Sequence, residues 1–200
     1  MKKIKNTLLG ISLFYIGIYI PIALMAYIPY WYIFNCELHP FCNRIGYPNA
    51  LGYIYELNDF LLHRSNLSHN WTMKERLHLS EVRDILDVLA VAAILGIIIL
   101  IAFFKKSKIS TYARVNLVIT LSLLLILPFF KNFWIKAFHP LFFDNNLWQT
   151  NTIDVCFYIM PRDFFKHSTI FLISFSTVIN GLLWLFFRKH KGNSVKKEAI

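Results

Sequence analysis

Apolar residues run through this chain in four long stretches that polar segments separate. The stretches span residues 7–34, 85–104, 113–130 and 168–187. Each approaches the roughly 20 residues that an α-helix needs to cross a hydrocarbon core about 30 Å thick. Because lipid offers no hydrogen-bond partners to an exposed backbone, such stretches cross a bilayer as helices. The pattern therefore predicts an all-α integral membrane protein with four transmembrane helices.

The first stretch is the least regular of the four. Pro21 and Pro29 lie inside it and are expected to bend the helix. A basic start followed by apolar residues also fits a cleaved signal peptide. The apolar part is longer than such a signal needs and lacks a small-x-small cleavage site, so we favour an uncleaved helix.

Composition strengthens the membrane assignment. Of the 200 residues, 56% are hydrophobic and only 16% are charged, which exceeds the apolar content of an ordinary soluble domain. The sequence contains no internal repeat, low-complexity segment or sign of a second domain. We therefore expect a single membrane domain over residues 1–200.

Basic residues indicate the orientation of the chain. Twelve of the 21 lysines and arginines fall in three short segments: Lys2, Lys3, Lys5, Lys105, Lys106, Lys108, Arg114, Arg188, Lys189, Lys191, Lys196 and Lys197. The positive-inside rule places these segments, and with them both termini, on the cytoplasmic side. The net charge of +10 then comes mainly from the cytoplasmic segments beside the spans. We expect no nucleic-acid partner, because the chain has no soluble recognition domain.

Two longer connections, residues 35–83 and 131–167, are then the outer segments. They are rich in His, Asp, Glu, Asn, Trp and Tyr, whereas the cytoplasmic connections are short and plain. Tryptophan and tyrosine favour the headgroup layer. We expect both outer segments to pack at the outer membrane surface and to carry whatever chemistry the protein performs.

The first candidate site residue is His78, in the stretch "ERLHLSEVRDILD" that leads without a helix breaker into the second span. We interpret this stretch as an outward extension of that helix. At helical spacing His78 and Glu81 share one face. A carboxylate one turn from an imidazole can hold its tautomer and raise its basicity. A solvated, charge-mixed helix start is the alternative interpretation.

The second candidate is His139, in "AFHPLFFDNNLW" between two apolar stretches. Pro140 suits a first helical position, so a short helix is expected at or just after His139, with Phe143 nearby. Ionisable residues near membrane depth tend to face an internal cavity. A satisfied interfacial histidine is the alternative.

The two histidines are more informative together than apart. Each lies in an outer segment, beside acidic or amide groups and close to a span. If they converge, they supply a base and a second proton donor or oxyanion partner, as acyl transfer requires. The chain has no Gly-x-Ser-x-Gly elbow, so such an enzyme would use histidine chemistry without a serine nucleophile.

These motifs resemble the signatures of the lipoprotein intramolecular transacylase family Lit, small four-span proteins of low-GC Gram-positive bacteria. The matching residues are His78, Glu81, Val82, Arg83, Phe138, His139, Phe142, Phe143, Asn145, Trp148, Pro161, Phe164 and Phe165. The number of spans, their orientation and the chain length also agree with those of the family, so the resemblance covers essentially the whole chain. Two departures stand out: Glu81 replaces an aspartate, and "QTNTID" at 149–154 replaces a segment that usually begins Leu-Asp-Pro.

The resemblance implies a transfer within one substrate molecule. The sn-2 acyl chain of a diacylglyceryl-cysteine lipoprotein moves onto the free α-amino group of the same cysteine, which gives a lyso-form N-acyl lipoprotein. The implied partners are this diacylated lipoprotein and membrane lipid, with no obligate protein partner, no cofactor and no metal. The implied location is the bacterial cell membrane, with the active site facing the outer leaflet.

The resemblance also suggests roles for individual residues. One of the catalytic residues His78 and His139 accepts the amine proton, and the other steadies the oxyanion or protonates the departing glyceryl oxygen. Residues expected to support them are Glu81, Arg83, Asp144 and Asn145, and residues expected to contact substrate are Trp148 and Phe143. The alternative for several of these is a loop held at the headgroups by hydrogen bonds and an aromatic anchor.

The cysteines suggest a rival function. Cys36, Cys42 and Cys156 lie in the outer segments, as in four-span thiol-quinone oxidoreductases such as DsbB. Those enzymes need a closely spaced redox pair and a second pair to relay electrons, whereas this chain has Cys-x5-Cys and one further cysteine. A Cys36–Cys42 disulfide with a free Cys156 fits the oxidising side better.

A second rival is a small transporter or a metal-binding membrane protein. Additional imidazoles are available at His39, His63 and His69. None of them forms His-Glu-x-x-His or another compact ligand spacing, so we favour the transacylase.

Overall fold

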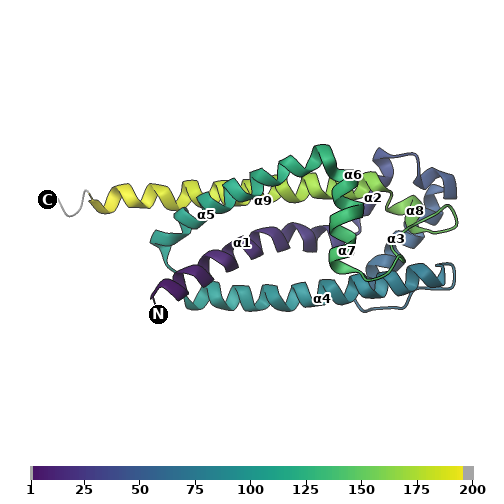
Figure 1. Cartoon of the computed structure of the whole chain (residues 1–200), viewed down its shortest axis with the longest axis horizontal. Coiled ribbons are helices and arrows are strands. Elements are labelled where there is room, and N and C mark those ends of the chain that lie inside the picture. Colours follow the sequence, from purple (N-terminus) through teal and green to yellow (C-terminus); the bar gives the residue numbers. More distant parts are fainter. Residues whose placement is uncertain (1, 196–200) are drawn as a thin grey trace. The chain divides into compact units, whose positions relative to one another are not determined.

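The computed structural model describes residues 2–195 and consists of helices and connecting segments within that range, without a strand (Figure 1). This confirms the predicted all-α fold class. The basic tail residues Lys196 and Lys197, used above to infer orientation, lie outside the described residues, as does Glu198.

The α-helices have the following bounds: α1 Lys2–Tyr27, α2 Tyr30–Leu38, α3 Tyr47–Leu61, α4 Met73–Ala102, α5 Lys106–Ser122, α6 Phe130–Phe133, α7 His139–Phe142, α8 Cys156–Ile159 and α9 Arg162–Val195. Two 3₁₀ helices, η1 Cys42–Ile45 and η2 Leu123–Phe129, and a π-helix, η3 Trp134–Phe138, complete the order.

Four helical segments are long and apolar enough to cross a membrane, as predicted. They are Lys3–Tyr27, Met73–Ala102, Lys108–Phe142 and Arg162–Arg188. The second segment includes the stretch from Glu75 to Asp87, which confirms that it extends the second span. The third passes from α5 through η2, so its backbone changes helix type at Leu123.

The first predicted span, residues 7–34, is wrong as a continuous helix. The helix α1 ends at Tyr27 and α2 begins at Tyr30, with Ile28 and Pro29 between them outside either helix. A proline disfavours helical backbone at the residue before it, which explains the break at Ile28. Pro21, in contrast, lies inside α1.

The chain divides into two compact units. Of the described residues, unit 1 comprises 2–21, 88–125 and 170–195, and unit 2 comprises 22–87 and 126–169. The prediction of one membrane domain over residues 1–200 stays a prediction.

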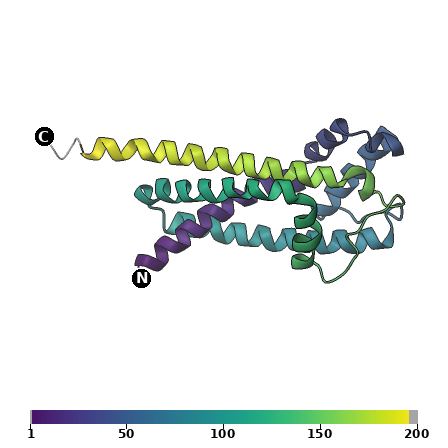
Figure 2. The same cartoon turned by 45° about the horizontal axis from the view of Figure 1, so that its top comes forward.

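Unit 1 is built from segments of α1, α4, α5 and α9, which both views show as long helices (Figures 1 and 2). Leu13, Ile109 and Ala113 form a buried apolar cluster within it. Close approach of backbones is possible at Gly17, whose carbonyl accepts a 2.8 Å hydrogen bond from the buried Ser176 hydroxyl. Such small and hydroxylated residues are typical of helix contacts in membranes.

Unit 2 contains the short helices α2, α3, α6, α7 and α8 (Figure 1). Its centre is apolar, with Ile54, Leu57, Trp71 and Ile159 essentially inaccessible to solvent. These side chains come from α3, α8 and the connection before α4, so the outer segments fold onto one another instead of extending into solvent.

A disulfide joins two elements of unit 2, α2 and η1. Cys36 of α2 and Cys42 of η1 are bonded, with their Cα atoms 5.5 Å apart. Cys156 is free and buried. Both findings confirm the cysteine pairing expected from the sequence.

Candidate active site

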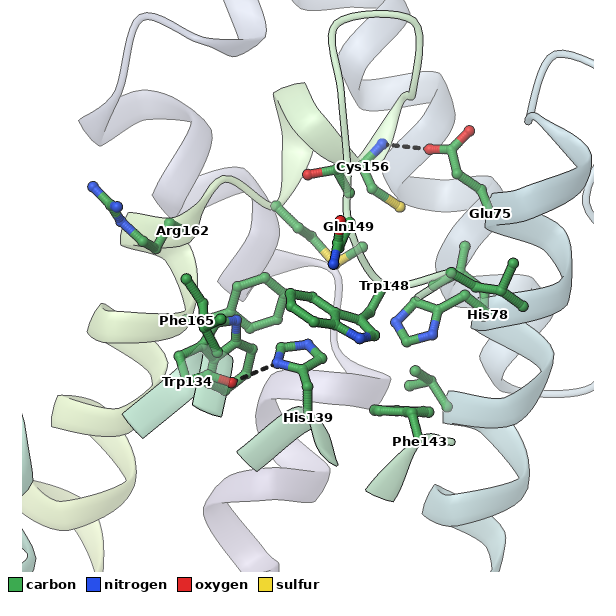
Figure 3. A pocket seen from close by; sticks show the side chains of 16 residues that line it. Glu75, His78, Trp134, His139, Phe143, Trp148, Gln149, Cys156, Arg162 and Phe165 are labelled. Carbon is green, nitrogen blue, oxygen red and sulfur yellow. Dashed lines mark hydrogen bonds between the residues drawn. The ribbon is translucent and has the colours of Figure 1, made fainter. Parts of the chain in front are cut away.

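A cavity of about 510 Å³ opens within unit 2. Its volume falls within the usual range for small-ligand sites. The start of α4 supplies one wall, the segment from the π-helix to Phe143 a second, and the loop from Leu147 to Cys156 with the start of α9 the rest. Both predicted catalytic histidines line it, and Figure 3 shows their rings directed into the same space.

His78 reaches the cavity from the second turn of α4. Its Nδ1 atom lies 3.5 Å from Glu81 Oε2, the separation of an ion pair and too loose for a formed hydrogen bond. The spacing i to i+3 on one helix face makes this contact possible, as predicted. The edge of Phe143 packs against the imidazole, with the ring centroids 4.7 Å apart.

Glu81 is itself held from the opposite side of the site. Asn145 Nδ2 donates a 2.7 Å hydrogen bond to Glu81 Oε1, and the Asn145 Oδ1 atom accepts one from the Leu147 amide at 2.9 Å. The amide therefore cannot turn freely, and the carboxylate keeps one oxygen toward His78. Two of the predicted supporting residues thus form a chain of contacts to the first histidine.

His139 has a different environment. It is 5% exposed and follows the π-helix directly. Its Nδ1 atom lies 2.7 Å from the Trp134 carbonyl oxygen. A carbonyl only accepts hydrogen bonds, so Nδ1 carries the proton and the neutral ring keeps its lone pair on Nε2.

Aromatic rings enclose His139. The indole of Trp148 stacks on the imidazole with centroids 4.1 Å apart, and Trp134 meets it edge-on at 4.7 Å. Phe143 lies 5.9 Å away and contacts His78 as well, so it lies beside both imidazoles. The plane of the His139 ring is consequently fixed by packing on one face and by a hydrogen bond at one edge.

None of the four predicted supporting residues lines the cavity itself: Glu81 and Asn145 lie behind His78, and the other two lie farther from the imidazoles. The guanidinium of Arg83 lies over the Phe60 ring, 4.2 Å from its centroid, and so contacts α3. Asp144 is exposed to solvent. Their expected roles in the reaction stay predictions, as do the roles of the other site residues.

Several residues that line the cavity were not predicted from the sequence. Glu75 is the most informative because Thr72-x-x-Glu75 is a capping box, a pattern that is readable from sequence. Other lining residues with no sequence signal of their own are Trp134, Gln149, Cys156, Met160 and Arg162. Trp134 reaches the cavity from η3, and the others reach it from the segment between α7 and the first residue of α9.

Cys156 borders the cavity without the properties of a nucleophile. Burial is the main cause that raises the pKa of its thiol well above the usual range, and the neighbouring Glu75 carboxylate raises it further. A thiol in this environment stays protonated at neutral pH, whereas nucleophilic cysteines depend on the thiolate. The prediction that the imidazoles of His78 and His139 are the catalytic groups is therefore kept in preference to a thiol nucleophile.

The cysteines and the metal-ligating side chains bear on the two rival functions. The disulfide Cys36–Cys42 has only the buried Cys156 as a further cysteine in the chain, so no second redox pair exists to relay electrons. Within residues 2–195, no three His, Cys, Asp or Glu side chains are grouped to hold a metal ion.

Known proteins supply independent evidence. Residues 7–165 match the family model described as "Lipoprotein intramolecular transacylase Lit". No curated protein sequence matches the chain. The fold is similar to that of the membrane integral lipoprotein intramolecular transacylase Lit from Bacillus cereus, with a TM-score of 0.81 and 17% identity over 100% of this chain and 98% of that chain.

Two variants of the Bacillus cereus protein have similar folds. One carries a histidine-to-arginine substitution and gives a TM-score of 0.75 at 17% identity, covering 98% of this chain and 95% of that one. The other carries a histidine-to-alanine substitution and gives 0.73 at 18% identity, covering 100% and 96%. The family match spans well over half of the chain and coincides with the fold of an integral membrane protein, so this chain belongs to the Lit family of lipoprotein intramolecular transacylases, which are acyltransferases.

Proposed function

We propose that the protein moves the sn-2 acyl chain of a diacylglyceryl-cysteine lipoprotein onto the α-amino group of the same cysteine. The product is a lyso-form lipoprotein with one acyl chain on nitrogen and one on the glyceryl group. One observation carries the proposal: His78 and His139 line a single cavity, each with its own fixed partner.

The reaction balances as an isomerisation. The amine nitrogen attacks the ester carbonyl carbon, a C–N bond forms, and the carbonyl oxygen becomes an oxyanion. The bond between this carbon and the glyceryl oxygen then breaks. The proton released by the amine ends on the glyceryl oxygen, so the site needs one group that accepts a proton and one that donates it.

No acyl donor, nucleotide or metal is required by this chemistry. The nucleophile and the ester belong to one molecule, and well-oriented intramolecular reactions reach effective molarities on the order of 10⁵ to 10⁸ M. Most of what the protein must supply is the folded conformation of the substrate, a path for the proton and a partner for the oxyanion.

His139 is the proposed base. The proton on its Nδ1 atom is engaged by the Trp134 carbonyl, and the opposite nitrogen, Nε2, has the free lone pair. An α-amino group has a pKa of about 8, so a neutral imidazole at this position suits removal of the proton that the amine loses during attack.

His78 is the proposed partner of the oxyanion and the donor to the glyceryl oxygen. The proton that His139 accepts from the amine then passes to the deprotonated His78, which restores both rings for the next turnover. When the His78 imidazole is protonated, the Glu81 carboxylate beside its Nδ1 atom offsets part of the cost of burying that charge, and Asn145 keeps the carboxylate in place. A cationic ring can donate from Nε2 to an oxygen that gains negative charge. The chain of contacts from Asn145 to His78 therefore acts as an orienting device.

The remaining walls are proposed to bind the acyl chains and the glyceryl group. Trp148 and Phe143 lie against the two imidazoles and present aromatic surface to a substrate in the cavity. Outer-leaflet placement of the site follows from the basic clusters of the cytoplasmic segments. A lipoprotein anchored in that leaflet would enter from the surrounding lipid without a protein partner.

A labelled lipopeptide tests the proposal. The substrate carries a deuterated sn-2 acyl chain and is mixed in lipid with an unlabelled lipopeptide of different peptide mass and with the purified protein. We expect fragmentation mass spectrometry to find the labelled chain on nitrogen of its own peptide, at unchanged total mass. Label on the other peptide would rule out an intramolecular route, and label that stays on the glyceryl group would rule out the proposed transfer.

A further inference from the structure

Polar and charged groups at one side of the cavity join the start of α4 to the loop before α8 and to the first residue of α8. The group comprises Thr72, Lys74, Glu75, Gln149, Asp154 and Cys156, and we call it the clasp. We propose that the clasp positions His78 and His139 relative to each other for acyl transfer. The inference rests on the proposed function and adds residues to which no role has been given.

Lys74 makes the ionic part of the clasp. Its Nζ atom lies 2.5 Å from Asp154 Oδ2 and donates a 2.8 Å hydrogen bond to the Gln149 carbonyl. Asp154 is 1% exposed, and its Oδ2 atom also accepts a 2.8 Å hydrogen bond from the Asn151 amide. One lysine thus holds two points of the loop, at Gln149 and at Asp154.

Glu75 makes the second part. Its Oε1 atom accepts a 2.7 Å hydrogen bond from the Cys156 amide, and its Oε2 atom accepts one of 2.9 Å from the Thr72 amide. Although it is only 2% exposed, this carboxylate has a donor on each oxygen. It therefore caps α4 and fixes the beginning of α8 at the same time.

The Thr72 hydroxyl links the two carboxylates. Its Oγ1 atom lies 2.9 Å from Glu75 Oε2 and 3.0 Å from Asp154 Oδ1. Buried charges are costly unless each is paired and hydrogen-bonded, and a network that meets this condition is rigid. The loop conformation is therefore coupled to the start of α4 through groups that tolerate little displacement.

The clasp is connected to both histidines by short covalent paths. Lys74 and Glu75 precede His78 by about one helical turn, so they fix the segment of α4 that bears it. Gln149 directly follows Trp148, the residue stacked on His139. Figure 3 shows Glu75, Cys156 and Gln149 around the cavity that the two imidazoles share.

This arrangement distinguishes a positioning role from simple stabilisation. A clasp that only stabilises the fold would change the thermal midpoint without changing turnover by folded protein. A clasp that sets the separation of the imidazoles would change kcat, because a displacement on the order of 1 Å can lower a rate about a hundredfold. Substrate affinity, which depends on the apolar walls, would change much less.

The test compares three variants of the full chain in lipid. Lys74→Met removes the cation and keeps the side-chain length, which leaves the Asp154 carboxylate buried and unpaired. Lys74→Met with Asp154→Asn removes both charges and so relieves that cost, but restores no bond to the Gln149 carbonyl. Lys131→Met, at an exposed site in α6, is the matched control.

We expect Lys74→Met to lower kcat at least about tenfold with KM within a factor of about two of the wild-type value. Hydrogen exchange should become faster in residues 149–156, where the Asn151 and Cys156 amides are bound by the carboxylates. The double variant should regain thermal stability while kcat stays low. The Lys131→Met protein should match the wild type.

Two outcomes would overturn the inference. One is a Lys74→Met protein with wild-type kcat, and the other is a double variant in which kcat recovers together with thermal stability. A wild-type protein that forms no N-acyl product would instead overturn the proposed function itself, and with it the reason for positioning the histidines.

Discussion

At the scale of single residues, the two histidines differ in what holds them. His139 is oriented by a backbone carbonyl, which no substitution of Trp134 removes, whereas His78 depends on the side chain of Glu81. The partner of His139 is part of the helix backbone and is present whatever side chain stands at position 134. The partner of His78 is lost when Glu81 is substituted. Substitutions around the two rings should therefore have different consequences.

Trp148 tests how much stacking contributes at His139. Replacement by alanine removes the ring that covers the imidazole and should lower kcat about tenfold, because His139 then rotates out of its reactive plane. Trp148→Phe should keep most of the activity, since a smaller ring can still stack. Initial rates of lipopeptide conversion give the comparison, with exposed Leu141→Ala as control, and equal rates for Trp148→Ala and wild type would refute the role.

Glu81 tests the orientation of His78. Glu81→Ala should lower kcat by about ten- to a hundredfold, because the imidazole loses both the adjacent charge and its positional restraint. Glu81→Asp should retain substantial activity, since related sequences are expected to have aspartate here. Asp84→Ala, on the same helix but exposed, is the control, and a Glu81→Ala protein as active as this control would exclude the proposed role.

Cys156 tests the assignment of chemistry to imidazole. Burial and the Glu75 carboxylate raise the pKa of its thiol, so the fraction of thiolate stays small at neutral pH and grows only as the pH rises toward that pKa. Iodoacetamide at pH 7 should leave the folded protein unmodified and alkylate it after denaturation. Mass spectrometry measures alkylation of the folded and of the denatured protein. The Cys156→Ala variant should transfer acyl chains at a near-normal rate, and loss of turnover in that variant would implicate the thiol.

At the scale of elements, the segment leading to His139 shows what sequence patterns can and cannot predict. Pro140 correctly indicated a short helix at His139. The preceding π-helix Trp134–Phe138 has no comparable signal, because its residues would also fit an ordinary α-helix. Yet this π-turn brings the Trp134 carbonyl to the imidazole, and π-helical turns are frequent at functional sites.

Outside the cavity, the Cys36–Cys42 disulfide connects two elements of unit 2. It joins α2 to η1, and the Cys42 sulfur lies 3.5 Å from the Tyr158 carbonyl of α8. Replacing Cys36 and Cys42 by serine should cost about 2 kcal/mol of stability, the magnitude for a short closed loop. Thermal unfolding in detergent with and without reductant measures this loss.

Acyl transfer at low temperature should survive the same double substitution, because neither sulfur lines the cavity. An essential redox role would predict the reverse: unchanged stability and abolished turnover. The pair of measurements therefore separates a structural disulfide from a catalytic one.

At the scale of the whole molecule, hydropathy was sufficient for the fold class because length and apolarity directly determine what crosses a bilayer. The break at Ile28 was foreseeable from Pro29, although a bend was expected where the helix in fact ends. The motifs around His78 and His139 correctly located two walls of the cavity. The motif residue Phe165 lies in a further wall, but the same motif did not indicate that its neighbours Met160 and Arg162 would also line the cavity.

The orientation of the chain in the membrane is predicted from its charge distribution. It rests on the basic clusters at Lys2 to Lys5 and Lys105 to Arg114 and on the tail. By the positive-inside rule this charge bias predicts that the outer segments, with the cavity that they form, face the side on which the proposed lipoprotein substrate is anchored.

The most direct measurement of the central claim is single-turnover conversion of a diacylated lipopeptide by wild type, His78→Ala and His139→Ala proteins in lipid. The two-histidine account predicts that the wild type forms the N-acyl isomer and that each variant, with unchanged thermal midpoint, loses at least about a hundredfold in rate. The double variant should lose little more, since the two rings serve one step. A folded single variant with near-normal turnover would contradict the account.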